Sequence, residues 1–191
     1  MNAAGRIDRT VAYPIRDLRA FLAGAWRIVR RIGDRRLGIV GRLEGCATFA
    51  PTARGFCYDE SGTLQFGAYR GSVTQRYLFD IEDSAPAAKI CLADGRPFYV
   101  LDLRSGVANV AHDCGADRYR GRYRTFCADD WTLTWRVDGP RKRYSIATRY
   151  SRDAPSALNP QIESIDRRRD TCTNPLGRGR PPAMPLKGDM L

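Results

Sequence analysis

The only histidine of the chain, His112, lies in a segment whose residue types could support chemistry. Cys114 follows two positions later, so on a strand the two side chains would share a face, where they could bind a soft metal or lie beneath a haem. One histidine with no second clear ligand is more often a hydrogen-bonded wall residue, so the sequence identifies no cofactor. His112 could also act as a general acid/base, with Asp117 orienting the imidazole if a bulge at Gly115 shifts the register.

An uninterrupted two-residue alternation runs from Asp117 to Phe126 and predicts a strand with two unlike faces. Four arginines occupy one face, and because they cannot be buried without partners, that face is expected to point to water. The opposite face is semi-polar, which suits the wall of a binding cavity better than a dry core. Its members are Asp117, Tyr119, Gly121, Tyr123 and Thr125.

Further candidates for ligand binding come from two other segments. Lys142 and Tyr144 alternate on a later strand and are expected to face the same cavity, unless Lys142 lies at the rim and extends to water. Arg96 could place a second cation at the cavity mouth, although the run around it also reads as an ordinary turn. The predicted ligand-binding residues are Tyr119, Tyr123, Lys142, Tyr144 and Arg96, with His112 beside them.

A single all-β domain is predicted to position these residues. Pro14 is expected to open a short helix that Gly24 ends, and from Trp26 onward the pattern indicates nine or ten short strands joined by tight turns. One hairpin is expected to turn at residues 60–62. Closing such an antiparallel meander into an up-and-down barrel removes its exposed edges and leaves room for one small ligand.

Composition limits the function classes and the domain boundaries. Residues 1–13 are expected to form a loose lead-in, residues 14–152 the barrel, and the proline-rich basic residues 153–191 a disordered tail. A net charge of +11 favours anionic partners, which could be nucleic acid, anionic lipid or an acidic small molecule, although it also fits a basic surface alone. No segment approaches the length of a membrane span.

The six cysteines show no CxxC pair, so neither zinc-site spacing nor a disulfide scaffold is indicated. No secretory signal is visible, because the early apolar stretch at residues 18–26 is short and interrupted by arginine. A reducing cytoplasm is therefore the expected location.

Several runs resemble the calycin superfamily, which includes lipocalins and fatty-acid-binding proteins, and within it an uncharacterised bacterial family of calycin-like domains. These runs are FLAGAWRIVRRI, FGAYRG, ADGRPFYVLDL, HDCGADRYRGRY and GPRKRYSIATRY, and the resemblance covers residues 21–152. It implies that Trp26 plugs one end of the barrel beneath Arg149 or Arg143, both in structural roles. Lys142 and Tyr144 resemble the Arg-x-Tyr carboxylate clamp of fatty-acid-binding proteins, with a less directional lysine in place of arginine.

Three functions follow as hypotheses. The first is binding of a small anionic or aromatic molecule in the barrel cavity, and the second is acid/base catalysis by His112 in the same cavity, so whether the protein is an enzyme stays open. The third is nucleic-acid binding by the arginine face and the basic tail. It ranks last, because the interleaved tyrosines that a single-strand binder would use point the other way. The ligand and the oligomeric state are not determined by the sequence.

Overall fold

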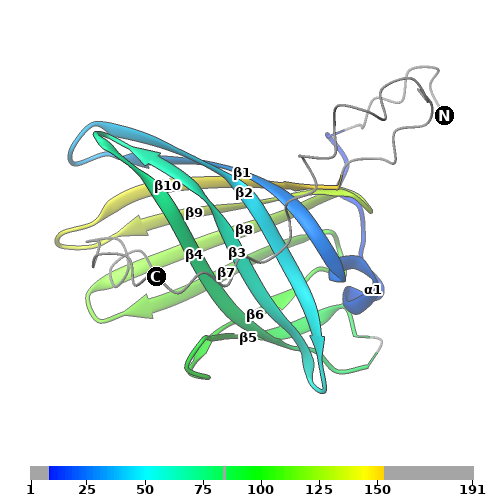
Figure 1. The fold of residues 1–191 in the computed structure, drawn as a ribbon. Helices are drawn as coiled ribbons and strands as arrows, with labels where there is room; N and C mark the ends of the chain where they lie inside the picture. Colours follow the sequence, from blue (N-terminus) through cyan, green and yellow to red (C-terminus); the bar gives the residue numbers. More distant parts are fainter. Residues whose placement is uncertain (1–8, 84, 153–191) are drawn as a thin grey trace, which may run out of the picture. The chain divides into compact units, whose positions relative to one another are not determined.

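Ten antiparallel strands form one sheet that curls into a nearly closed barrel in the computed structural model, which describes residues 9–83 and 85–152 (Figure 1). The predicted all-β, up-and-down architecture is confirmed. The strands are β1 (Gly24–Asp34), β2 (Ile39–Thr52), β3 (Gly55–Phe66), β4 (Tyr69–Asp80), β5 (Ala87–Leu92), β6 (Pro97–Asp102), β7 (Val107–Cys114), β8 (Asp117–Cys127), β9 (Asp130–Asp138) and β10 (Arg143–Ser151).

The strand order explains how the barrel closes. It runs β6-β5-β4-β3-β2-β1-β10-β9-β8-β7, so the first strand pairs with the last and every other pairing joins neighbours along the chain. β6 and β7 are the two ends of this order, and they lie alongside one another. The contact between them is therefore the seam of the barrel.

A short helix, α1 (Leu18–Leu22), lies at the end of the barrel where β1 begins (Figure 1). It starts later than the predicted Pro14, because the side chain of Asp17 caps it by accepting a hydrogen bond from the backbone N–H of Ala20 at 3.0 Å. Its apolar residues Leu18, Phe21 and Leu22 are buried, so the helix closes this end of the barrel.

The alternation predicted for β8 is confirmed. Tyr119, Gly121, Tyr123 and Thr125 are buried, while the arginines between them face outward. The residue at position 121 is a glycine for a steric reason, since a Cβ there would lie 2.8 Å from the Trp135 ring. Gly115 does not form the bulge considered above. With a φ of 59° it lies in the turn between β7 and β8, where a glycine adopts the left-handed conformation at little cost.

The hairpin predicted at residues 60–62 is wrong. β3 passes through these residues without a break, and the chain reverses after Phe66, at Gly67 with a φ of 57°. Gly62 is needed for a close approach between strands, because a Cβ there would lie 2.6 Å from the carbonyl oxygen of Glu44. Glu60 is not a turn residue: its side chain is buried and paired with Arg30.

The predicted domain boundaries can be compared only with the described residues. The barrel lies within the range expected for it, whereas the predicted tail at residues 153–191 and the first eight residues of the lead-in fall outside the described residues. In the part of the chain that is described, no helix is both long enough and apolar enough to cross a membrane.

Candidate functional site

Three of the predicted site residues meet at one point on β8 and the β9–β10 turn. Lys142 donates a hydrogen bond to the hydroxyl of Tyr119 at 3.1 Å and forms an ion pair with Asp117 at 2.9 Å. Burial alone would lower the pKa of Lys142, but the hydrogen bonds to Tyr119 and Asp117 outweigh it, and the pKa is raised. Lys142 is therefore a permanent cation whose charge Asp117 balances.

His112 reaches across the seam of the barrel. Its Nδ1 lies 3.0 Å from the backbone carbonyl oxygen of Phe98 on β6, and its ring contacts the Phe98 ring edge-on at 4.7 Å. A carbonyl only accepts, so Nδ1 carries the hydrogen and Nε2 is the basic nitrogen of the neutral ring. The predicted partner Asp117 instead pairs with Lys142. The described residues contain no cluster of three or more side chains suited to holding a metal.

Two other predicted ligand residues are Arg96, between β5 and β6, and Tyr144, on β10. Arg96 is exposed and bonds Asp94 in its own turn, with Nε 2.8 Å from Oδ2. Backbone and side-chain hydrogen bonds from Arg96 lower the pKa of Asp94. Tyr144 is half-buried at the start of β10, on the face that continues with buried Ile146 and Thr148.

A buried ion pair that the sequence interpretation did not include lies inside the barrel. Arg30 on β1 binds both carboxylate oxygens of Glu60 on β3, at 2.8 and 2.6 Å, and its Nε donates to the hydroxyl of Thr148 at 2.8 Å. Tyr58 donates to the same carboxylate at 2.6 Å. Burial would lower the pKa of Arg30, but the charge of Glu60 more than compensates and raises it.

Seven aromatic side chains form a closed circuit of contacts that includes Tyr58, the tyrosine bonded to Glu60, and we call it the aromatic circuit. Neighbouring rings contact one another at centroid distances between 3.6 and 6.3 Å, and the 3.2 Å contact between two tyrosine hydroxyls completes it. In order, its members are Tyr58, Tyr77, Phe98, Tyr99, Tyr123, Trp131 and Tyr150. Tyr123 is thus the one predicted ligand residue that belongs to it.

The tyrosine hydroxyls of the aromatic circuit stay protonated across the physiological range. Burial is the largest cause of the raised pKa at each of Tyr58, Tyr77, Tyr99 and Tyr123, and it raises the pKa of Tyr150 to about 12. Tyr99 and Tyr123 lie 2.6 Å apart through their hydroxyls. The circuit therefore presents neutral hydrogen-bond donors together with flat apolar rings.

The sequence contained a signal for this ion pair. Phe56, Tyr58, Glu60 and Leu64 lie on one face of a two-residue alternation, so the pattern allowed a continuous strand with an inward carboxylate. The glycine at position 62 made a turn the favoured interpretation. Arg30 shares a strand face with Trp26 and Ile28, which are buried, but nothing local in the sequence indicates its partner.

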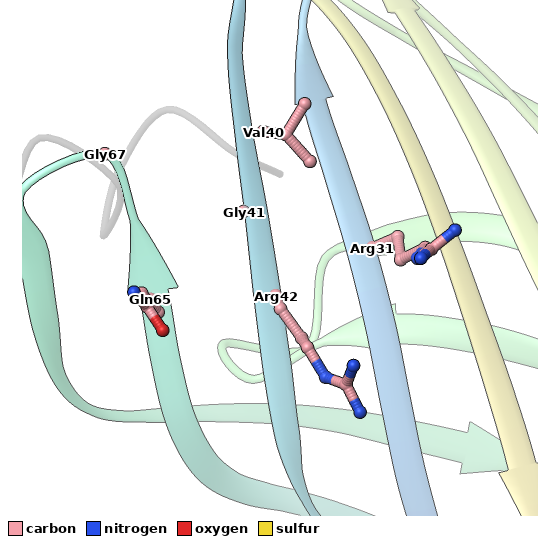
Figure 2. Close-up of a pocket in the computed structure, with 6 residues that line it drawn as sticks. All are labelled: Arg31, Val40, Gly41, Arg42, Gln65 and Gly67. Atoms are coloured by element: carbon pink, nitrogen blue, oxygen red, sulfur yellow. The ribbon is translucent and has the colours of Figure 1, made fainter.

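A depression of about 450 Å³ lies on the outer face of β1, β2 and β3, away from the inward-facing residues (Figure 2). Its walls include the exposed side chains of Arg31 on β1 and Arg42 on β2, and Val40, two residues before Arg42, is also exposed. These differ from the residues predicted to bind a ligand.

The structural arginine assigned to Trp26 requires a correction. Arg152, rather than Arg149 or Arg143, lies over the Trp26 ring, with its guanidinium carbon 3.9 Å from the ring centroid. Arg152 also donates to the carbonyl oxygen of Phe21 at 3.0 Å. The alternation of β10 explains the error, because Arg149 and Arg143 occupy its outward face.

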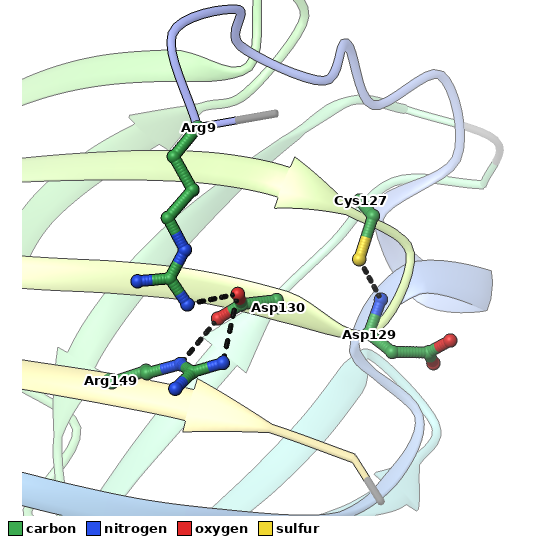
Figure 3. Close-up of polar contacts among 5 residues, drawn as sticks. All are labelled: Arg9, Cys127, Asp129, Asp130 and Arg149. Carbon is green, nitrogen blue, oxygen red and sulfur yellow. Dashed lines mark hydrogen bonds and ion pairs between the residues drawn. The ribbon is translucent and has the colours of Figure 1, made fainter. Parts of the chain in front are cut away.

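Arg149 binds a buried carboxylate instead (Figure 3). Its Nε lies 2.9 Å from Oδ1 of Asp130, whose side chain is 2% exposed, and Arg9 reaches the other oxygen of that carboxylate at 2.8 Å. Hydrogen bonding to Asp130 is the main cause of the raised pKa of Arg149. Arg149 and Arg9 thus tie β10 and the N-terminal segment to the start of β9.

Comparison with known protein families assigns this chain to a family. Residues 22–152, nearly the whole barrel, match a family of unknown function, DUF6314. The chain belongs to this family. No curated protein matches the sequence significantly. As a DUF6314 member, the chain inherits no activity or site residues from its family, so the site rests on the structure.

The solved structures that are similar to this chain are distant in sequence. The S-type phycobiliprotein lyase CPES from Guillardia theta is similar with a TM-score of 0.51 at 7% identity, over 70% of this chain and 89% of that one. A redesigned β-barrel, mFAP1, bound to DFHBI, has a TM-score of 0.36 at 11% identity, over 70% and 98%. A Nostoc punctiforme protein of unknown function from the DUF3598 family has a TM-score of 0.47 at 13% identity, over 78% of this chain and 52% of that one. At 7% identity, the likeness to the lyase concerns the fold alone.

Proposed function

We propose that this DUF6314 protein binds a small aromatic molecule within its barrel, against the aromatic circuit. The observation that carries the proposal is that seven aromatic side chains from six strands converge on the barrel interior. Two of them, Tyr77 and Trp131, carry hydrogen-bond donors with no partner among the described residues. Flat apolar walls with a few converging polar groups are typical of small-molecule sites. The proposal includes membership of the calycin superfamily and the cytoplasmic location expected from the cysteines.

Ring stacking supplies the binding energy in this proposal. Trp131 and Tyr150 already stack in parallel at 3.6 Å, and Tyr77 and Phe98 stack with an interplanar angle of 7°. A planar ligand would exchange such ring–ring contacts for ring–ligand contacts of the same kind. A barrel of ten strands also has a wider interior than the eight-stranded barrels that hold one small ligand.

Two measurements test the proposal on the full chain. Native mass spectrometry of the freshly purified protein is expected to reveal a bound small molecule, and tryptophan fluorescence is expected to show saturable quenching by at least one planar probe among anthracene, 9,10-anthraquinone and anthraquinone-2-carboxylate. Replacing Tyr150 by leucine should weaken probe binding at least ten-fold. Tyr99→Leu serves in its place if Tyr150→Leu does not fold.

Tyr13 provides the matched control, because its side chain is exposed and lies outside the aromatic circuit. Tyr13→Leu should bind the probe as the unaltered protein does. The proposal is overturned if no probe binds saturably and no molecule copurifies, or if Tyr13→Leu weakens binding as much as the circuit variants.

The other two hypotheses remain predictions. Catalysis by His112 would require loss of turnover without loss of binding in His112→Gln. Nucleic-acid binding would use the outward arginines of β8, and would weaken steeply with added salt. The aromatic circuit favours small-molecule binding over both, because its rings face the barrel interior.

A further inference from the structure

The hydrogens available inside the barrel can be counted residue by residue, since each phenol has one O–H and an indole has one N–H. Tyr58 donates its hydrogen to Glu60, so in the contact between Tyr58 and Tyr150 the donor is Tyr150. Tyr99 and Tyr123 share one hydrogen bond, which uses the hydrogen of only one of them. One hydroxyl hydrogen of that pair is left over.

Two further donors of the aromatic circuit have no acceptor among the described residues. The hydroxyl of Tyr77 and the indole nitrogen of Trp131 are both buried and unpaired. Together with the spare hydrogen of the Tyr99–Tyr123 pair, three donors are without an acceptor in the described part of the chain. Buried polar groups in folded proteins nearly always have a partner, so these donors point to acceptors that a bound molecule supplies.

Two cationic side chains of the barrel are already paired with carboxylates. Arg30 holds both oxygens of Glu60, and Lys142 holds Asp117. An anionic ligand would have to displace a carboxylate that is already bonded in place, or enter without a counter-charge. The interior therefore favours a ligand without net charge.

We propose that the aromatic circuit selects an uncharged, planar, conjugated molecule that carries at least two carbonyl-type acceptors, which receive hydrogen bonds from Tyr77, Trp131 and the Tyr99–Tyr123 pair. This inference rests on the proposed function and narrows its ligand class. It replaces the anionic ligand predicted from the sequence, for which Lys142 would have acted as a carboxylate clamp.

Three probes that share one ring skeleton separate the effects of ring contacts, carbonyl acceptors and negative charge on binding. Anthracene has the rings alone, 9,10-anthraquinone adds two carbonyl acceptors, and anthraquinone-2-carboxylate adds a negative charge. Tryptophan quenching should give a dissociation constant for the quinone at least ten-fold below those of the other two, the amount expected when unpaired donors gain acceptors.

The variant Tyr77→Phe removes one hydroxyl that has no partner among the described residues, so the folded barrel loses no described hydrogen bond. Its melting temperature should be unchanged or higher. Binding of 9,10-anthraquinone should weaken about five- to ten-fold, while anthracene should bind as before. Tyr13→Phe, on an exposed tyrosine, is the matched control and should change neither.

The outcomes distinguish this inference from the function on which it rests. Tighter binding of the carboxylate than of the quinone overturns the uncharged class. Unchanged quinone binding in Tyr77→Phe, or equal weakening of quinone and anthracene, overturns the donor assignment. In each case saturable probe binding would still support a small-molecule site, whereas failure of all three probes would count against the proposed function itself.

Discussion

Replacing Glu60 by glutamine would leave the Arg30 guanidinium inside the barrel without its counter-charge. The two carboxylate oxygens lie 2.8 and 2.6 Å from the guanidinium nitrogens, and the side chains are 18% exposed at Arg30 and 3% at Glu60. At an effective dielectric constant of about 20, unit charges about 2.7 Å apart attract one another by about 6 kcal/mol. Part of this is offset by desolvation, which the folded protein has already borne.

Breaking a buried pair by removing one partner typically costs about 3–5 kcal/mol. Because Arg30 is partly exposed and glutamine still offers one acceptor, we expect Glu60→Gln to lower the free energy of unfolding by about 3 kcal/mol. For a chain of this size that corresponds to a decrease in melting temperature of about 6–12 °C. Urea unfolding followed by circular dichroism gives the free energy directly.

Asp59, the neighbour of Glu60 in the sequence, provides the control. It pairs with Arg76 at 2.6 Å, but both side chains are about half exposed, so Asp59→Asn should cost below about 1 kcal/mol. The double variant Arg30→Met with Glu60→Leu should recover most of the lost stability, because no charge is then left unpaired. If Glu60→Gln costs no more than Asp59→Asn, the ion pair is not the stabilising contact described above.

Three further predictions concern other contacts. Burial raises the pKa of Tyr150 to about 12, above the value of about 10 for a phenol in the unfolded chain. The contribution of Tyr150 to stability is therefore complete below about pH 10 and is lost as the pH rises toward 12. Tyrosinate absorbance should show Tyr150 ionising above about pH 10, and ionisation at the unfolded value in the folded protein would contradict its burial. Arg152→Ala removes the cation over Trp26 and should cost about 1–2 kcal/mol in urea unfolding; a cost near zero would argue against the contact. His112→Ala removes the bond to the Phe98 carbonyl and should speed amide hydrogen exchange in β6 and β7 but not in β2, so unchanged exchange at the seam would show that His112 does not hold it.

Local pattern predicted the strands well and the inward pairings poorly. The face of β8 that carries Tyr119 and Tyr123 was recognisable because alternation is a property of an extended backbone, and it holds wherever the strand lies. The unbroken course of β3 was missed, since a glycine beside polar residues is typical of a turn, and only the packing against Glu44 shows why Gly62 lies inside a strand. The predicted site residues Lys142 and Asp117 do meet, as an ion pair with one another.

The all-β class, the approximate number of strands and the outward direction of the β8 arginines can be read from the sequence, because each depends on residues close together in the chain. Which inward side chains meet one another depends on the three-dimensional fold. Pairing of β1 with β10 brings Arg30 beside Thr148, and the curvature of the sheet brings Glu60 within reach across β2. Such contacts depend on how the barrel closes, a property of all ten strands together that no single segment encodes.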